Sequence, residues 1–252
     1  MSARSGPARI AAVIFDLGGT LLDWNDWDGE VPGRWQRAFD LLEASALYRE
    51  LPGRDAFVAA MVEAEEAHWR RVVAEHWSGP PSSLVSAGLR ALDMHVSEAA
   101  ILPILDAYAR AVDRTAFVFP DTGQVLEELR GRGYRLGLLS NTWWAAEWHN
   151  ADLATHGLSG LLDGLVYTSD LPHSKPHPAV FLHTAALLEA QPSECLMVGD
   201  WPEYDIAGAL NAGMRAVWKT NGRERAEPPA IAATATIAHL AELPALIEQL
   251  QG

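Results

Sequence analysis

The sequence predicts an α/β protein: a doubly wound, Rossmann-like, mostly parallel sheet interrupted by an inserted all-helical domain. Short, continuously apolar runs recur along the chain, as is typical of parallel strands buried on both faces. Helix-like stretches separate most of these runs. Residues 24–115 contain no such run and show helical patterns instead. We therefore expect an α/β core domain from residues 1–23 and 116–252, and a helical domain from residues 24–115.

The first half of the chain gives one strand and then only helices. An apolar run at 10–15 predicts the first strand, which Asp16 closes. Four helices are expected after it, separated in part by the turn residues Pro52-Gly53 and Gly79-Pro80-Pro81. The longest has apolar side chains at helical spacing and a polar opposite face. The expected helices span 31–47, 55–77, 83–92 and 97–112.

The second half returns to alternating strands and helices. A helix follows Asp121 and ends near Gly131 and Gly133, and another spans 203–212 before Gly213. A final helix is expected around Leu240–Ile247, after a Pro228-Pro229 loop. Apolar runs predict strands at 134–139, 164–168, 195–199 and 215–218.

Composition excludes several classes of partner. The net charge of −14 argues against binding to nucleic acid or to an anionic membrane. A single cysteine, Cys195, excludes an internal disulfide and suggests a buried thiol in a reducing compartment. No apolar run approaches the length of a membrane span, and we expect a cytoplasmic protein. At 252 residues the chain is long enough to bury a large core.

Polar side chains stand where the predicted strands end. Asp16, Ser140 and Asp200 each close an apolar run, and ligands of open α/β sheets collect at such carboxyl ends. The chain has seventeen Arg but only two Lys, Lys175 and Lys219. A Lys retained at position 175 indicates a need for a compact ammonium rather than a planar guanidinium.

These residue types suit phosphoryl transfer. Two carboxylates and a backbone carbonyl are ligands that Mg²⁺ prefers. A carboxylate can also act as a nucleophile that forms a covalent intermediate. Phosphoryl transfer mainly requires positioning and neutralisation of charge, which a metal, a lysine and a hydroxyl can supply.

Four segments together resemble the haloacid dehalogenase superfamily of hydrolases over nearly the whole chain. They are Asp16-Leu17-Gly18-Gly19-Thr20, Leu139-Ser140-Asn141, Lys175-Pro176, and Gly199-Asp200 with Asp205. The resemblance implies that Asp16 is the nucleophile. It also implies a Mg²⁺ ion held by Asp16, the Gly18 carbonyl and Asp200, with Asp205 just outside the ligands. Ser140 and the Asn141 backbone would bind phosphoryl oxygens, Lys175 would steady the nucleophile, and the inserted helices would form a cap over the site.

One position departs from the family pattern. Phosphatases of this family usually carry a general-acid Asp two residues after the nucleophile, and this chain has Gly18 there. General acid–base catalysis is worth about 10²–10⁴ in rate. Two alternatives therefore stay beside a phosphatase that acts on a small phosphorylated metabolite. One is a dehalogenase, although that branch lacks the acidic metal site, and the other is a non-catalytic member that binds a phosphorylated ligand. A phosphonate-cleaving activity that needs a cap lysine is disfavoured, because residues 24–114 contain none.

Half of the ten tryptophans follow the first, second and fourth of these four segments. They are Trp24, Trp27, Trp143, Trp144 and Trp201. Two interpretations are open: a packing seam between cap and core, or a pocket wall that contacts a planar or apolar part of the substrate. On the pocket-wall interpretation, the substrate is bound by Trp24, Trp143 and Trp201 together with Asn141. His149, His173 and His177 lack metal-ligand spacing, and we expect surface or substrate contacts for them at most. We expect a monomer or a homodimer.

Overall fold

Six strands form one parallel sheet in the computed structural model, which describes residues 9–25, 30–45, 52–222 and 231–251. The strand order is β5-β4-β1-β6-β7-β8, and each neighbouring pair is parallel. This confirms the predicted α/β sheet and adds β8, which the sequence analysis missed. The strands are β1 (Ala12–Phe15), β4 (Arg135–Ser140), β5 (Gly164–Tyr167), β6 (Cys195–Gly199), β7 (Arg215–Lys219) and β8 (Ala235–Ile237).

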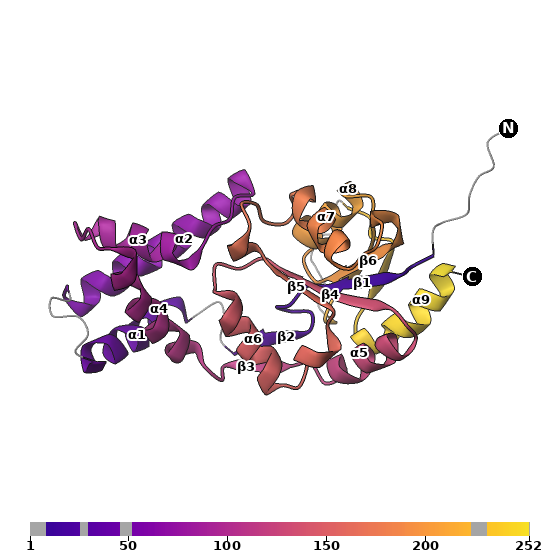
Figure 1. Ribbon diagram of the computed structural model, residues 1–252, viewed down its shortest axis with the longest axis horizontal. Coiled ribbons are helices and arrows are strands. Elements are labelled where there is room, and N and C mark those ends of the chain that lie inside the picture. Colours follow the sequence, from indigo (N-terminus) through magenta and orange to yellow (C-terminus); the bar gives the residue numbers. More distant parts are fainter. Residues whose placement is uncertain (1–8, 26–29, 46–51, 223–230, 252) are drawn as a thin grey trace.

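Helices cover both faces of this sheet because its strands are apolar on both sides. In β1, Val13 and Phe15 belong to one buried apolar cluster, whereas Ala12 and Ile14 belong to a second. The first cluster includes side chains of α5 (Thr122–Gly131), α6 (Ala146–Thr155) and α9 (Leu243–Gln251). The second includes side chains of α7 (Pro178–Leu187) and α8 (Ala207–Asn211), which lie on the opposite side in Figure 1.

The four inserted helices lie within two residues of their expected positions where the structure describes them; residues 46 and 47, the expected end of the first helix, are outside the described residues. They are α1 (Val31–Ser45), α2 (Arg54–Glu75), α3 (Pro81–Ala91) and α4 (Glu98–Val112). The prediction extended α2 to residue 77, but His76 adopts a left-handed conformation with φ 50° and ends the helix. No helix among the described residues is long and apolar enough to cross a membrane.

A short antiparallel ribbon flanks the inserted helices. Its strands are β2 (Leu22–Trp24) and β3 (Ala116–Val118), and Trp24 pairs with Ala116. The sequence analysis placed Trp24 at the start of the helical segment, because a strand of three residues is too short to show an alternating pattern. The division into core and cap stays a prediction, and its expected boundaries fall in this ribbon.

The end of α2 is hydrogen-bonded to the loop that leads to Lys175. Trp77 and His173 form an isolated antiparallel bridge. Beside it, the Ser174 N–H donates to the His76 carbonyl at 2.9 Å. The helical insertion is therefore joined to the core at a second place besides the β2–β3 ribbon.

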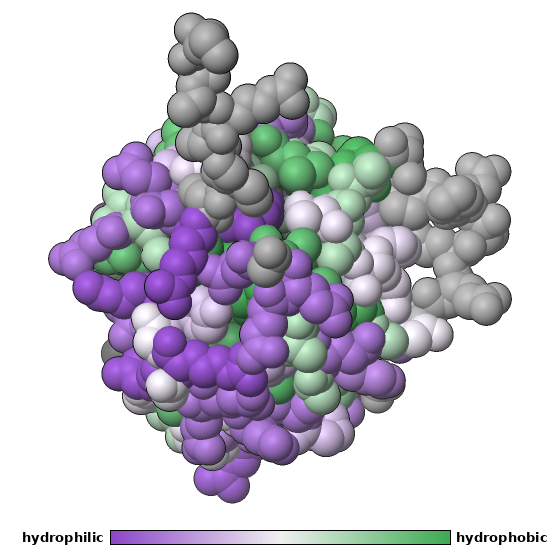
Figure 2. Space-filling view, turned by 90° about the vertical axis from the view of Figure 1, so that its right-hand side faces the viewer, coloured by the Kyte–Doolittle hydropathy of each residue, from purple (hydrophilic) through white to green (hydrophobic). Residues whose placement is uncertain are grey.

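The surface is largely polar on the face drawn in Figure 2. Hydrophilic side chains cover most of that face, and apolar ones are scattered between them. This polar face is consistent with the charged composition of the chain.

Candidate active site

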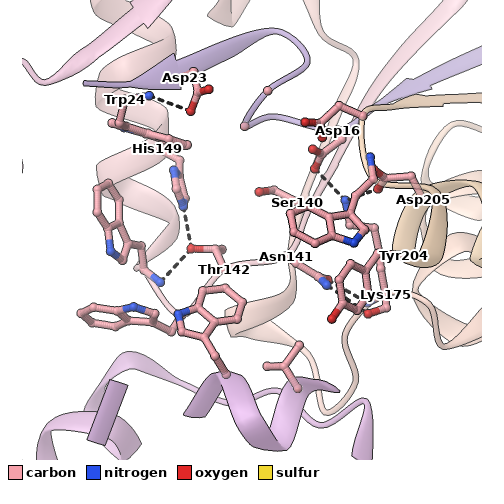
Figure 3. A pocket seen from close by; sticks show the side chains of 18 of the residues that line it. Asp16, Asp23, Trp24, Ser140, Asn141, Thr142, His149, Lys175, Tyr204 and Asp205 are labelled. Atoms are coloured by element: carbon pink, nitrogen blue, oxygen red, sulfur yellow. Dashed lines mark hydrogen bonds and ion pairs between the residues drawn. The ribbon is translucent and has the colours of Figure 1, made fainter. Parts of the chain in front are cut away.

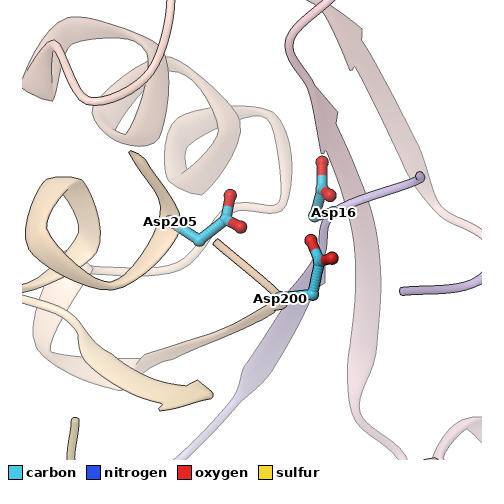
Figure 4. Close-up of side chains that lie close together, drawn as sticks. All are labelled: Asp16, Asp200 and Asp205. Atoms are coloured by element: carbon cyan, nitrogen blue, oxygen red, sulfur yellow. The ribbon is translucent and has the colours of Figure 1, made fainter. Parts of the chain in front are cut away.

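The three strands that carry the predicted polar residues are neighbours, in the order β4-β1-β6. Asp16 follows β1, Ser140 is the last residue of β4, and Asp200 follows β6. Their side chains are therefore brought to one edge of the sheet. Carboxylate oxygens of Asp16, Asp200 and Asp205 lie within 4.8 Å of one another. Figure 4 shows the three side chains close together. This is the clustering that the sequence predicted for the carboxyl ends of the strands.

Lys175 joins two of these carboxylates. Its Nζ donates to Asp16 Oδ1 and to Asp205 Oδ1, each at 2.6 Å (Figure 3). Burial by itself would lower the pKa of Lys175, but the charges of Asp16 and Asp205 outweigh burial and raise it. The ammonium therefore remains charged and fixes the orientation of the Asp16 carboxylate.

Asn141 fixes the loop that carries this lysine. The Lys175 N–H donates to Asn141 Oδ1 at 2.7 Å, and Asn141 Nδ2 donates to the Lys175 carbonyl at 3.0 Å. We expected only the Asn141 backbone to have a role, so the sequence analysis missed this pair of side-chain bonds. Ser140 is buried and lines the same cavity, and no described residue hydrogen-bonds its hydroxyl.

Asp205 is fixed on both of its oxygens. Oδ1 accepts from Lys175, and Oδ2 accepts from the Trp201 N–H at 3.0 Å. Trp201 lies directly before the short π-helical turn Pro202–Ile206, which contains Asp205. This turn explains how a residue five positions after Asp200 reaches the same site.

The carboxylates carry more negative charge than Lys175 balances. Burial raises the pKa of Asp16 to about 6, although Lys175 opposes the rise. Burial, followed by the charges of Asp16 and Asp205, raises the pKa of Asp200 to about 8. A divalent cation would relieve this repulsion, and the side-chain donors of the cluster are oxygens, which fits Mg²⁺.

The loop after Asp16 is compact because of two glycines. Gly19 has φ +71°, and a Cβ there would lie 2.2 Å from Asp200 Oδ2, so no side chain fits. The second lysine of the chain supports this loop: Lys219 Nζ donates to the Gly19 carbonyl at 3.1 Å and lies over the Phe119 ring. The sequence analysis did not assign Lys219 to the site, although the rarity of lysine was a usable signal.

A cavity of about 610 Å³ opens beside the carboxylates. The predicted substrate contacts Trp24, Trp143 and Trp201 line it, as do all the other predicted site residues. Trp27 falls outside the described residues. From the sequence, Asp23 and Asp26 are nearby groups that could serve as a base; Asp23 lines the cavity, and Asp26 lies outside the described residues. The sequence analysis missed other lining residues, which include Trp69, Val72, Val73, Thr142 and Tyr204.

The lining tryptophans differ in how much surface they offer. Trp143 is only 1% exposed and stacks on Trp35 of α1, with ring centroids 6.0 Å apart. Trp144 is 2% exposed, whereas Trp201 is 51% exposed. The packing-seam interpretation therefore suits Trp143 and Trp144, and the pocket-wall interpretation suits Trp201.

His149 is buried and lines the cavity, so of the two expectations for it, surface or substrate contact, the surface position is wrong. Its Nε2 lies 2.8 Å from Thr142 Oγ1, and its ring stacks between Trp144 and Tyr167. Burial lowers the pKa of His149 to about 3, so the ring is neutral. His173 and His177 stack on each other with ring centroids 3.9 Å apart, and neither lines the cavity.

A family model described as haloacid dehalogenase-like hydrolase matches residues 10–213, and the chain belongs to that family. The match spans the sheet edge, the inserted helices and all four site segments. The expected family is thus confirmed.

Curated proteins similar to the chain include phosphatases. The chain is 35% identical over 103 residues to the pyrophosphatase PpaX of Bacillus mycoides, covering 40% of this chain and 46% of the relative. It is 29% identical over 198 residues to the phosphoserine phosphatase of Thermus thermophilus, covering 74% and 76%. The chain spans about half the length of the first relatives that it matches.

Solved structures of both branches share the fold. A HAD phosphatase from Thermococcus onnurineus superposes with a TM-score of 0.62 at 25% identity, covering 96% of this chain and all of that one. A 2-haloacid dehalogenase from Pseudomonas syringae superposes with a TM-score of 0.68 at 27% identity, covering 95% and 99%. Overall shape therefore does not separate the two activities.

Proposed function

We propose that this chain is a Mg²⁺-dependent phosphohydrolase that cleaves a small phosphorylated metabolite through an aspartyl-phosphate on Asp16. The observation that carries the proposal is the buried cluster in which Lys175 bridges Asp16 and Asp205, with Asp200 beside them. The phosphatase relatives add support. A cytoplasmic location and a monomeric or homodimeric state belong to the same proposal.

Asp16 performs the first step. One of its carboxylate oxygens attacks phosphorus, and the bond between phosphorus and the leaving oxygen breaks with its electron pair. Lys175 orients the attacking carboxylate through Oδ1. The Ser140 hydroxyl and the Asn141 N–H hold the phosphoryl oxygens, and Asn141 also fixes the Lys175 backbone. With Gly18 at the acid position, the leaving oxygen takes its proton from water.

A water molecule completes the reaction. It attacks phosphorus of the aspartyl-phosphate, the bond to the Asp16 oxygen breaks, and inorganic phosphate leaves. The proton released by the attacking water passes to solvent.

The donor set fits the metal that the family implies. Asp16, Asp200 and the Gly18 carbonyl would hold Mg²⁺, and Asp205 lies beside them in contact with Lys175. When bound, the ion neutralises charge on the phosphoryl oxygens.

The dehalogenase alternative has one observation in its favour, the superposition on the Pseudomonas syringae enzyme. Asp200 weighs against it, because a halide-expelling reaction needs no metal and gains nothing from an added buried carboxylate. Non-catalytic binding of a phosphorylated ligand is the third alternative. The buried Lys175–Asp16 pair favours a working nucleophile over this role.

A substrate screen separates these functions. The protein is assayed on phosphorylated metabolites with Mg²⁺, with Mg²⁺ plus EDTA, and on 2-chloropropionate without metal. We expect EDTA-sensitive release of phosphate and no release of chloride. Metal-independent chloride release would establish the dehalogenase instead. Saturable binding of phosphate esters without turnover would establish the non-catalytic alternative.

A further inference from the structure

The described lining of the cavity offers no second cationic side chain for an anion. Among its described lining residues Lys175 is the single Lys or Arg, and that ammonium already contacts Asp16 and Asp205. On α2, which forms one wall, Arg70 pairs with Glu63 and Glu66, and Arg71 pairs with Glu75. A carboxylate or second phosphate on the substrate would therefore enter the cavity without a cationic partner, at a substantial desolvation cost.

Negative charge also extends away from the metal end of the cavity. Asp23 lines the wall and comes from the middle of β2, not from the strand edge that holds Asp16 and Asp200. Its Oδ1 accepts from the backbone N–H of Trp24 at 2.9 Å, which fixes the orientation of the carboxylate. The part of the substrate beyond the phosphate thus meets a carboxylate and an indole from consecutive residues.

Aromatic rings supply most of the remaining wall. Trp24, Trp69, Trp201 and Tyr204 line the cavity from three different segments, β2, α2 and the turn after β6. Trp24 is held by a 3.1 Å bond from Nε1 to Asp152 Oδ2 and by edge contact with Trp144 at 5.5 Å. Faces of Trp and Tyr attract cations by about 0.5–2 kcal/mol, most strongly where water is excluded.

We propose that the substrate is a phosphate monoester of an alcohol that carries an ammonium group, with no carboxylate or second phosphate. This inference rests on the proposed phosphatase function and names its substrate class. The ammonium lies between the aromatic rings and near Asp23, while the phosphate lies at Asp16 and Lys175. A cavity of about 610 Å³ accommodates a molecule of this size.

The chemistry at Gly18 favours the same class. The leaving oxygen receives no proton from a side chain at position 18, so the reaction depends on a leaving group that tolerates negative charge. When the ammonium is two carbons away from the leaving oxygen, as in choline, its positive charge stabilises the negative charge that develops on that oxygen. A cationic alcohol is therefore a better leaving group here than a neutral alkyl alcohol of the same shape.

The test compares three phosphate esters of similar size. Phosphocholine has a cationic alcohol portion, and 3,3-dimethylbutyl phosphate is its isostere with a neutral alcohol portion. The third, the phosphate monoester of 3-hydroxypropanoate (3-phosphopropanoate), has an anionic carboxylate in its alcohol portion. Binding to the Asp16→Asn variant with Mg²⁺ is measured by titration calorimetry, so that differences in leaving-group reactivity do not enter. We expect phosphocholine to bind at least tenfold more tightly than the isostere, and 3-phosphopropanoate to bind most weakly.

Asp23→Asn, combined with Asp16→Asn, should reduce that tenfold ratio of dissociation constants towards one. Asp106→Asn, on the exposed side of α4, is the matched control and should keep the ratio. Hydrolysis of p-nitrophenyl phosphate with Mg²⁺ is measured separately on the native chain. If the native chain hydrolyses it but Asp16→Asn binds the neutral isostere as tightly as phosphocholine or more tightly, the substrate class is overturned and the phosphatase stands. If Asp16→Asn binds no ester and the native chain does not hydrolyse p-nitrophenyl phosphate, both are overturned.

Discussion

The Trp24 indole fills the space beside Gly18. A Cβ at position 18 would lie 3.1 Å from Cζ3 of this ring. The ring cannot easily move aside, because Nε1 is bonded to Asp152 and one edge packs on Trp144. Trp24 therefore occupies the space that an Asp side chain at position 18 would need, so this part of the site has an aromatic ring in place of a proton donor.

This arrangement predicts the outcome of restoring the acid. Gly18→Asp alone should give no gain on alkyl phosphates, because the new side chain clashes with Trp24. Gly18→Asp combined with Trp24→Ala should raise kcat on alkyl phosphates at least tenfold over Trp24→Ala alone, within the ~10²–10⁴ that acid–base catalysis can contribute. Rates on a series of aryl phosphates provide the reference, since we expect a steep dependence on leaving-group pKa in the native chain. A flat dependence would show that some other group already supplies the proton.

Removal of the nucleophile should abolish turnover without unfolding the protein. Asp16→Asn keeps the size of the side chain and removes one charge from a crowded carboxylate cluster, so the melting temperature should not fall. Phosphate release should drop to the background rate. Substantial Mg²⁺-dependent activity in a variant with a native circular-dichroism spectrum would contradict the covalent mechanism.

Metal binding should depend on Asp200. Asp200→Ala removes a carboxylate whose pKa is raised to about 8 by burial and by its acidic neighbours, the repulsion that a cation relieves. Calorimetric titration with Mg²⁺ should show affinity at least tenfold weaker than in the native chain, whereas Asp106→Ala should leave it unchanged. If Asp200→Ala binds Mg²⁺ as tightly as the native chain, the proposed ligand set is wrong.

Mild acid should destabilise the fold through His149, because this ring takes up a proton when the chain unfolds. Its pKa is about 3 in the folded chain and 6.5 for the unperturbed group, so the unfolded chain binds more protons between these values. The stability contribution is complete above about pH 6.5 and is lost as the pH falls below it. Between pH 7 and pH 5 this group should remove about 2 kcal/mol from the free energy of unfolding.

His149→Gln, which stays neutral, isolates that contribution. Urea unfolding at both pH values should show a pH-dependent loss about 2 kcal/mol smaller in the variant than in the native chain. His68, whose pKa is lowered to about 4 by burial, adds a similar loss to both proteins and cancels in the comparison. An identical loss in the two proteins would show that His149 is not buried in its neutral form.

Two tryptophans should respond in opposite ways to truncation. Trp143→Ala removes a buried ring that packs on Trp35 and Tyr108, and should cost about 3–5 kcal/mol of stability. Trp201→Ala removes a half-exposed ring and should raise KM for larger substrates with little loss of stability. Turnover of p-nitrophenyl phosphate serves as the reference for both. A large stability loss in Trp201→Ala, with KM unchanged, would make its loop part of the packing seam.

The residues at the strand ends could be predicted from the sequence, but the contacts between loops could not. Asp16, Ser140 and Asp200 were predictable because apolar runs mark buried strands, and parallel strands end at a common edge. The β2–β3 ribbon was not predictable, since each strand has three residues and is stabilised by its partner far along the chain. The Asn141–Lys175 bonds and the position of Trp69 likewise depend on how distant segments pack, which no local pattern encodes.

The backbone bridge between Trp77 and His173 connects the end of α2 to the loop that carries Lys175. The His76–Ser78 segment follows α2, and the residues it bonds to lie within three positions of Lys175. A movement of α2 away from the sheet would either break these backbone bonds or displace the loop that holds the Lys175 ammonium against Asp16. In the proposed phosphatase, a movement of α2 that admits substrate would therefore also shift the loop that holds Lys175, and a substitution in the His76–Ser78 segment would change turnover without altering the residues that line the cavity.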